Sequence, residues 1–416
     1  MTRTLHFADE LFDAQLTRTV AYAAQGGAEL GECLETARRI TRVDATQWYD
    51  EWLATADRLE RIAVQSLADG HRVSARGAWL RASNYHRTAG LFLIGPDPRF
   101  AESIRRQAHA FRCAADLFDV PPTPVRIPYA DTHLPGYFFP TVDPVTDDRP
   151  RPLLVVTNGY DGTAEELYFA NAAAALGRGY HVLVFDGPGQ GSVLTEQRLP
   201  MRPDWEAVIT PVLDLAPTLP GVDTSRVALM GWSFGGYLAP RAATAEHRLA
   251  ACISDSGPYD LRAATLDRIP GPLRRRVVHG SPVARALLAR IMRRMLARPT
   301  AGWGLRRGMY VHGVDDPLDY VDLTADYTLR GHEQLIECPT FVCTTQGDDV
   351  ASRAGELAAA LAAPHESVTF SAADGVTGHC EMSGRAVFHQ RAFDWLDGVL
   401  AVCDVRASTS GRHVGR

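Results

Sequence analysis

A serine set between glycines is the first residue whose surroundings could support chemistry. The segment Gly231-Trp232-Ser233-Phe234-Gly235 follows directly on a short apolar run, residues 227–230, which has the composition of a buried parallel strand. In a Gly-x-Ser-x-Gly nucleophile elbow the serine occupies a strained turn between a strand and a helix, and the glycines permit the close backbone approach that this turn requires. The pattern predicts Ser233 as a nucleophile and the backbone N–H of Phe234 as an oxyanion donor at the start of the next helix.

A base and an acid must accompany such a serine, because a hydroxyl is a weak nucleophile until a neighbouring group takes its proton. In elbow-type sites the chain order is Ser, then Asp or Glu, then His. His379 lies on a Gly-rich loop after the strand predicted over residues 367–370 and is the predicted base. Asp348 and Asp349 both follow the strand predicted over residues 340–344, and the spacing from that strand does not choose between them.

The loop after the first buried strand, residues 157–162, is the expected source of a second oxyanion donor. We predict the backbone N–H of Tyr160 for this role, with an ordinary tight turn as the alternative. Two other motifs are not assigned a binding or catalytic role. The glycine-rich segment 187–191 lacks the GxGxxG spacing of a phosphate cradle, and His379-Cys380-Glu381 has no more distant metal ligands with it in the sequence. No metal and no cofactor are predicted.

The order of the elements predicts the fold class. Short apolar runs alternate with helical stretches from residue 153 onward, which is typical of a doubly wound, mostly parallel α/β sheet. Strands are predicted over residues 153–157, 181–185, 227–230, 251–254, 340–344 and 367–370, after a hairpin of residues 125–129 and 134–140. Helices are predicted over residues 164–177, 204–215, 234–246, 352–361 and 385–400.

Two long helical regions fall outside this alternation. From residue 7 to residue 119 apolar residues recur at three- and four-residue steps, and the prolines of residues 121–124 then end the pattern. About seventy further helical residues separate two of the predicted strands and are interpreted as a lid. The predicted division is an N-terminal helical cap (1–120), a first part of the core (121–260), a helical lid insertion (261–337), a second part of the core (338–403) and a disordered tail (404–416).

Aromatic residues in both helical regions have two interpretations. The stripe Trp79, Tyr85 and Phe92 in the N-terminal region has the spacing of core packing, with a substrate-lining role as the alternative. The lid carries Trp303, Met309, Tyr310 and Tyr327, which could line a pocket or pack within the lid itself. The sequence does not decide between these two roles.

Composition limits the partners of the protein. The chain has 416 residues, a net charge of −6 and a pI near 6.2, which argues against binding nucleic acid or an anionic membrane. Seven cysteines without a CxxC pair are expected in a reduced, cytoplasmic protein. No apolar stretch has the length of a signal peptide core or a membrane span. We expect a small-molecule substrate, and whether the chain forms a homodimer is left open.

Several longer motifs carry a resemblance to a known family. They are Asn158 to Tyr168 (NGYDGTAEELY), Phe185 to Gly191 (FDGPGQG), Asp204 to Glu206 (DWE), Arg248 to Ser254 (RLAACIS) and Gly378 to Glu381 (GHCE). With its helical N-terminal region, the chain resembles the 2,6-dihydroxypseudooxynicotine hydrolase family of α/β hydrolases, to which the fungal polyketide-shortening hydrolases also belong. The resemblance covers nearly the whole chain and implies an α/β-hydrolase fold.

The resemblance implies hydrolysis of a carbon–carbon bond next to a carbonyl by a Ser-Asp-His triad. Carried over, it assigns Ser233 as nucleophile and His379 as base. Family members with a Gly-Asp-Pro-Val-Ala loop align with residues 347–351 and select Asp348, although Asp349 stands where that proline would be. The additional acid of the nicotine-degrading enzyme finds no convincing match, and its candidates are Asp255, Asp260 and Asp267.

The expected activity is therefore cleavage of an acyl bond in a small polyketide-like or aromatic substrate, either a C–C bond beside a ketone or an ester or lactone. One alternative keeps the same triad but makes the protein a cyclase or acyltransferase of specialised metabolism. A second alternative is a small-molecule binding module without catalysis on the same fold.

Overall fold

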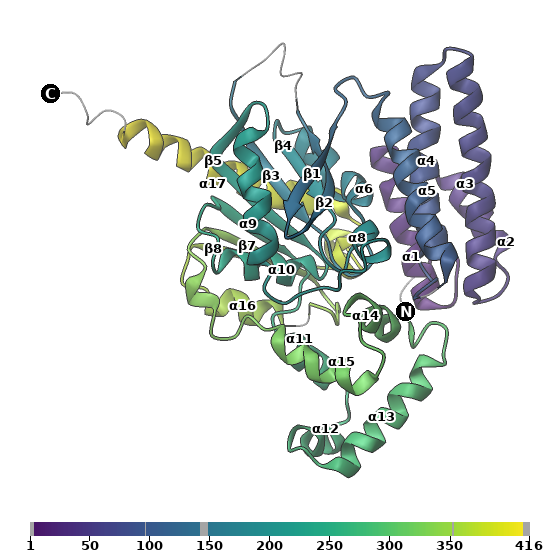
Figure 1. Ribbon diagram of the computed structural model, residues 1–416, viewed down its shortest axis with the longest axis vertical. Coiled ribbons are helices and arrows are strands. Elements are labelled where there is room, and N and C mark those ends of the chain that lie inside the picture. Colours follow the sequence, from purple (N-terminus) through teal and green to yellow (C-terminus); the bar gives the residue numbers. More distant parts are fainter. Residues whose placement is uncertain (1–3, 96, 142–148, 352, 411–416) are drawn as a thin grey trace.

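A single eight-stranded sheet forms the centre of the computed structural model, which describes residues 4–95, 97–141, 149–351 and 353–410 (Figure 1). The strand order is β1-β2-β4-β3-β5-β6-β7-β8, with β2 antiparallel to both of its neighbours and the other pairs parallel. The predicted doubly wound, mostly parallel sheet is confirmed. The strands are β1 (Thr123–Tyr129), β2 (Thr132–Phe139), β3 (Arg151–Thr157), β4 (His181–Phe185), β5 (Val222–Trp232), β6 (Ala251–Asp255), β7 (Thr340–Thr345) and β8 (His365–Phe370).

Alternate residues of the buried strands face two separate hydrophobic cores, because successive side chains of a strand point to opposite faces of the sheet. On β3, Leu154 and Val156 belong to the core shared with the N-terminal helices and the C-terminal helix, whereas Leu153 and Val155 belong to the opposite core. Helices therefore cover both faces of the sheet. The helices that follow or connect core strands are α6 (Ala164–Leu167), α7 (Ala173–Leu176), α8 (Gly191–Thr195), α9 (Glu206–Leu215), α10 (Gly235–Ala243), α16 (Ala354–Ala360) and α17 (Arg385–Ser410).

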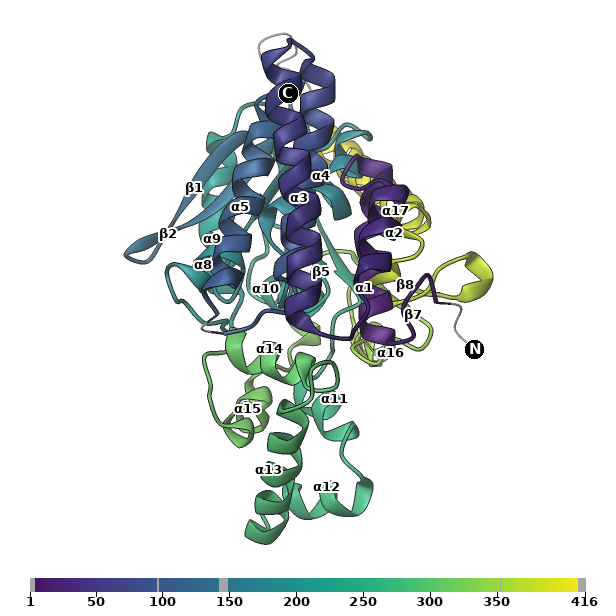
Figure 2. The ribbon, with the colours of Figure 1, turned by 90° about the vertical axis from the view of Figure 1, so that its right-hand side faces the viewer.

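The N-terminal region forms a group of helices beside the sheet, coloured purple to blue in Figures 1 and 2. Its longest helix buries one face, where Trp48, Trp52 and Leu59 are fully inaccessible, and Asp44 caps the first turn by accepting from the Gln47 amide at 2.8 Å. The aromatic stripe of this region belongs to the same hydrophobic core. These helices are α1 (Glu10–Ala21), α2 (Leu30–Arg39), α3 (Ala45–Ala68), α4 (Arg72–Gly90) and α5 (Pro98–Ala115).

The insertion between β6 and β7 is helical and extends away from the sheet, as the green segment in Figure 2 shows. It has a small core of its own, which includes Leu266, Leu288, Met292 and Val321. Such a core allows the insertion to keep its shape beyond its contacts with the sheet. The helices are α11 (Leu261–Asp267), α12 (Gly271–Val278), α13 (Pro282–Leu296), α14 (Trp303–Val311) and α15 (Pro317–Leu323).

The disordered tail over residues 404–416 stays a prediction. Helix α17 continues to Ser410, because a helix that has already formed adds further residues at little cost. Residues 411–416 lie outside the described residues. No helix in the described ranges is both long enough and apolar enough to cross a membrane.

Candidate active site

Ser233 occupies a left-handed turn between the end of β5 and the start of α10. Its φ is 62°, a conformation that is costly for a residue with a side chain and that clusters at functional sites. The neighbouring glycines make the turn possible: a Cβ on Gly231 would lie 1.8 Å from the carbonyl oxygen of Gly235. The Ser233 amide donates to the carbonyl oxygen of Asp255 at 3.0 Å, which ties the turn to β6. The strand, turn and helix stand in the order that the sequence predicted.

The structure brings Ser233, His379 and Asp348 into one chain of hydrogen bonds. Ser233 Oγ lies 2.8 Å from His379 Nε2, and His379 Nδ1 lies 2.8 Å from Asp348 Oδ2. The side chain of Asp348 is 2% exposed and also accepts from the Val350 amide at 3.0 Å. Asp349, the alternative acid, is exposed, and within the described residues it makes no hydrogen bond to His379.

Electrostatics within this chain favours an ion pair between acid and base. Burial acts to raise the pKa of Asp348, but the charge of His379 outweighs it and the pKa is lowered. Burial likewise acts to lower the pKa of His379, and the Asp348 carboxylate outweighs it so that the pKa is raised. Asp348 therefore holds a proton on Nδ1 of the imidazole, which leaves Nε2 as the atom that can take the serine proton.

Gly159, in the loop after β3, packs directly on the elbow. A Cβ at this position would lie 2.7 Å from the Phe234 nitrogen and 3.0 Å from Ser233 Oγ. The Gly159 amide is already bonded to Asn158 Oδ1 at 2.7 Å. Within the described part of the chain, the amides of Phe234 and Tyr160 donate to no protein acceptor, so both are free to meet a ligand.

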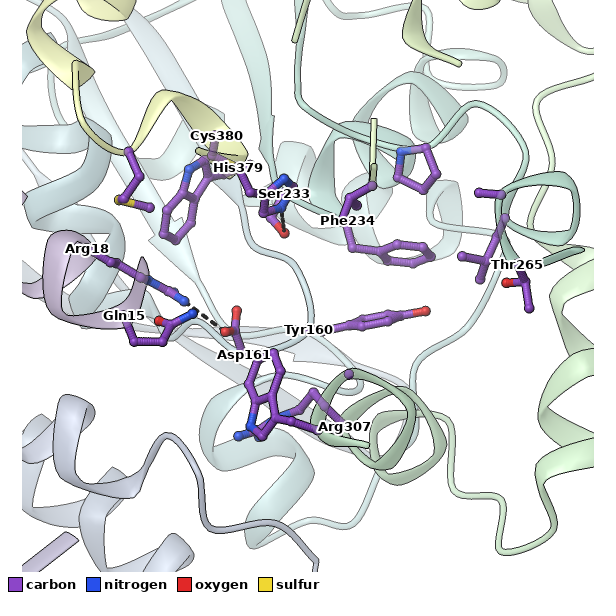
Figure 3. A pocket seen from close by; sticks show the side chains of 18 of the residues that line it. Gln15, Arg18, Tyr160, Asp161, Ser233, Phe234, Thr265, Arg307, His379 and Cys380 are labelled. Atoms are coloured by element: carbon purple, nitrogen blue, oxygen red, sulfur yellow. Dashed lines mark hydrogen bonds and ion pairs between the residues drawn. The ribbon is translucent and has the colours of Figure 1, made fainter. Parts of the chain in front are cut away.

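A cavity of about 210 Å³ lies over Ser233 and His379 (Figure 3). Its walls come from three parts of the chain: helix α1, the loops at the carboxyl ends of the strands, and the lid. Of the four lid residues considered from the sequence, Trp303 lines this cavity, whereas Met309 and Tyr310 line a separate one. The lining also includes Gln15, Arg18, Tyr160, Asp161, Trp232, Phe234, Leu261, Ala264, Arg307, Tyr320 and Met382.

A buried acidic pair behind His379 was not identified from the sequence. Glu381 Oε1 accepts from the hydroxyls of Ser256 and Thr345, both at 3.1 Å, and Arg385 Nη1 lies 2.7 Å from Asp255 Oδ2 and 3.4 Å from Glu381 Oε2. Burial, followed by the charge of Asp255, raises the pKa of Glu381 well above its ordinary range. Arg385 contacts both carboxylates. With a proton on Glu381, the negative charge of Asp255 and the positive charge of Arg385 cancel.

This acidic pair links the turn of Ser233 to the loop that follows His379. The backbone of Asp255 holds the Ser233 amide, while its side chain binds Arg385, which also donates to the carbonyl oxygen of Cys380 at 3.0 Å. Cys380 and Glu381 both have positive φ values, 55° and 53°, so the loop directly after His379 is strained and is held in place by these bonds. The sequence offered Asp255 only as one of three candidates for an additional acid and Glu381 only as the acidic residue two positions after His379, and nothing in it paired the two.

A second buried network fixes helix α1 to the loop beside the site. Arg18 binds Glu166 through two parallel bonds, at 2.8 and 2.7 Å, and Asp161 at 2.8 Å. Arg87 and the Tyr22 hydroxyl also contact Glu166. Because these partners lie more than 140 residues from Arg18, no local pattern in the sequence could have revealed the pairing.

Comparisons with known proteins agree with this geometry. The family model described as the alpha/beta hydrolase family matches residues 153–395, and the one described as esterase FrsA-like matches residues 36–260. Hydrolase acrC of Aspergillus aculeatus is 36% identical, over 94% of this chain and 97% of the relative. The 20-hydroxy-prefusarin hydrolase FUS2 of Gibberella moniliformis is 34% identical, over 95% of this chain and 98% of the relative.

Among solved structures, that of 2,6-dihydroxy-pseudo-oxynicotine hydrolase is similar over 92% of this chain and 96% of its own, with a TM-score of 0.72 and 22% identity. At 22% identity the similarity shows the fold alone, including the helical region ahead of the sheet.

Proposed function

Because this chain belongs to the α/β hydrolase family, we propose that Ser233, His379 and Asp348 act as a catalytic triad that cleaves an acyl bond. The observation that carries the proposal is the unbroken pair of 2.8 Å hydrogen bonds from Ser233 through His379 to Asp348, beneath the cavity. A side chain held in a strained turn and bonded to a base is arranged for nucleophilic attack.

In the proposed reaction, Ser233 Oγ attacks the substrate carbonyl while His379 Nε2 takes its proton. The amides of Phe234 and Tyr160 donate to the resulting oxyanion. His379 then returns the proton to the leaving group, which is a carbanion in C–C cleavage and an alkoxide in ester or lactone cleavage. Water, deprotonated by His379, releases the acyl group from the serine and restores the enzyme.

The proposed substrate is a small polyketide-like or aromatic carbonyl compound. Relatives with full-length similarity are named as hydrolases, one of them after 20-hydroxy-prefusarin, and the cavity has the largely apolar walls expected of a small-molecule site. The N-terminal helices and the lid enclose it from two sides, which is the role we propose for both regions. Six cysteines are free thiols, in keeping with a cytoplasmic location: Cys33, Cys113, Cys252, Cys338, Cys343 and Cys380.

The test is turnover of a panel of β-diketones, lactones and aryl esters, with products identified by mass spectrometry. Wild type should hydrolyse at least one class, and Ser233→Ala should lose about 10³-fold or more in kcat for that substrate. Gly271→Ala is a suitable control, because a Cβ at that partly exposed lid position meets nothing within 4 Å. Equal turnover by Ser233→Ala and wild type would refute the assignment of the nucleophile.

A further inference from the structure

The wall of the cavity that faces Ser233 and His379 is polar and positively charged. Figure 3 shows Gln15, Arg18, Asp161 and Arg307 gathered on this side of the cavity. None of these residues is part of the proposed triad or oxyanion site. They come from α1, from the loop after β3 and from α14, so the group forms only where the N-terminal helices, the core and the lid meet.

Arg307 is a buried cation without a carboxylate partner. Its residue is 2% exposed, and within the described ranges it makes one hydrogen bond, from Nη2 to the carbonyl oxygen of Leu91 at 2.9 Å, and no ion pair. Its Nε is buried with no acceptor. The guanidinium lies over the rings of Phe100 and Trp303, at 4.7 and 5.7 Å, which fixes its position but leaves its donors unused.

Gln15 provides a second unsatisfied polar group in the same wall. The residue is 9% exposed, and its buried Oε1 has no hydrogen-bond partner. Buried polar atoms are nearly always hydrogen-bonded, because an unmade bond costs about 1 to 3 kcal/mol. Both side chains line the cavity, where the guanidinium of Arg307 and the amide nitrogen of Gln15 can donate to a ligand, whereas Gln15 Oε1 can only accept.

The charges around this wall do not balance. Asp161 accepts from Arg18, and Glu166 is shared by Arg18 and Arg87, so two carboxylates already serve two guanidinium groups. Arg307 therefore adds an uncompensated positive charge beside Asp161. Burial lowers its pKa to about 10, and it stays charged at neutral pH. An unpaired buried cation is unfavourable, and an anion from the ligand would relieve that cost.

We propose that Arg307, assisted by the Gln15 amide, binds an anionic oxygen of the substrate, either a carboxylate or the enolate of a 1,3-dicarbonyl unit. The inference rests on the proposed function, since it places this oxygen across the cavity from the carbonyl that Ser233 attacks. A substrate held at both ends is oriented for reaction, and one that lacks the charge leaves Arg307 unpaired. Arg307 thus selects acidic substrates over neutral ones of the same shape.

Binding to the Ser233→Ala protein tests this proposal without turnover. Two matched pairs of probes are used. The first is dimedone, a cyclic 1,3-diketone that is ionised at neutral pH, against its 2,2-dimethyl derivative, which has no acidic hydrogen between its carbonyls and stays neutral. The second is benzoate against benzamide. Affinities are measured by calorimetry at pH 8. Protection of wild-type Ser233 from a fluorophosphonate shows that each probe occupies the cavity.

Arg307→Met should weaken binding of at least one anion about 10- to 100-fold and leave its neutral partner within about twofold. Arg307→Lys, which keeps the charge, should retain part of the preference, and Gln15→Leu should weaken the same anion by a smaller factor. Arg290→Met is the matched control, because it removes an equal charge from an exposed position of the lid and should change nothing.

The outcomes distinguish an enolate from a carboxylate as the bound anion. They also distinguish failure of this inference from failure of the proposed nucleophile. Loss confined to dimedone assigns the enolate, and loss confined to benzoate assigns the carboxylate; loss of both assigns either anion. The inference is overturned if neither anion binds more tightly than its neutral partner, or if Arg307→Met keeps the preference. A serine that does not react with fluorophosphonate would refute the proposed nucleophile while leaving these affinities as an independent result.

Discussion

Replacing Gly159 by alanine should impair catalysis without unfolding the protein. A Cβ at this position would lie 2.7 Å from the Phe234 nitrogen, 2.9 Å from the Ser233 Cβ and 3.0 Å from the Ser233 Oγ. Ordinary contacts begin at 3.4 Å, so the loop and the elbow must separate by about 0.7 Å. All three nearest atoms belong to the proposed nucleophile or to the adjacent oxyanion donor, and each therefore shifts together with the reacting groups.

The size of the effect follows from what is displaced. Loss of one oxyanion donor costs about 10²- to 10³-fold in kcat, and a misplacement near 1 Å costs about 10²-fold. We expect a decrease of about 10²- to 10³-fold for Gly159→Ala. Overpacking of this kind destabilises a protein by about 1 to 3 kcal/mol, which a domain of this size tolerates.

The assay is steady-state turnover of the best substrate, together with the rate of fluorophosphonate labelling and the melting temperature. Gly271→Ala is the matched control, since its added methyl group meets nothing within 4 Å and its turnover should equal that of wild type. If Gly159→Ala melts within a few degrees of wild type and retains kcat within about threefold, the proposed contact between this loop and the oxyanion site is wrong.

Three further predictions concern the acid, the base and the group behind them. Asp348→Asn should lower kcat by about 10³- to 10⁴-fold, as expected when the orienting carboxylate of a triad is lost, whereas Asp349→Asn should stay near wild type; equal losses would refute the choice between them. His379 accepts a proton only when neutral, and Asp348 raises its pKa against the effect of burial. A plot of kcat/KM against pH should therefore rise through a pKa above about 6.5, the ordinary histidine value, and this limb should move to lower pH in Asp348→Asn. Glu381→Gln should keep kcat within about tenfold, because the amide can replace a protonated carboxyl. Glu381→Met should lower kcat by more than tenfold and lower the melting temperature. The same loss of kcat in both variants would show that the proton on Glu381 is not what holds the loop.

Local patterns were enough to predict the elements that carry the site. The elbow is a strand, a turn and a helix that follow one another over residues 222–243, and the alternation of apolar runs with helices predicted the parallel sheet. The resemblance to the polyketide-processing hydrolases is confirmed by relatives of 34 to 36% identity. The loops of His379 and of the Asp348-Asp349 pair were identifiable because they follow strand ends at one edge of the sheet, and the resemblance then favoured Asp348.

Contacts between distant parts of the chain could not be predicted from these patterns. Asp348 and Asp349 are adjacent, and only the direction of their side chains in the folded loop separates the one bonded to His379 from the exposed one. Arg18 meets Glu166 across 148 residues, and Arg307 reaches the cavity only because α14 packs against the end of α4. The polar wall of the cavity therefore depends on the packing of three regions and leaves no mark at any one point of the sequence.

The central claim is that Ser233 is activated by His379, and intact-mass spectrometry after treatment with a fluorophosphonate tests it most directly. Wild type should gain the mass of one adduct, and Ser233→Ala should gain none. His379→Ala should react far more slowly than wild type, because its serine has lost the base. Labelling of Ser233→Ala to the same extent as wild type, or labelling of His379→Ala at the wild-type rate, would contradict the account.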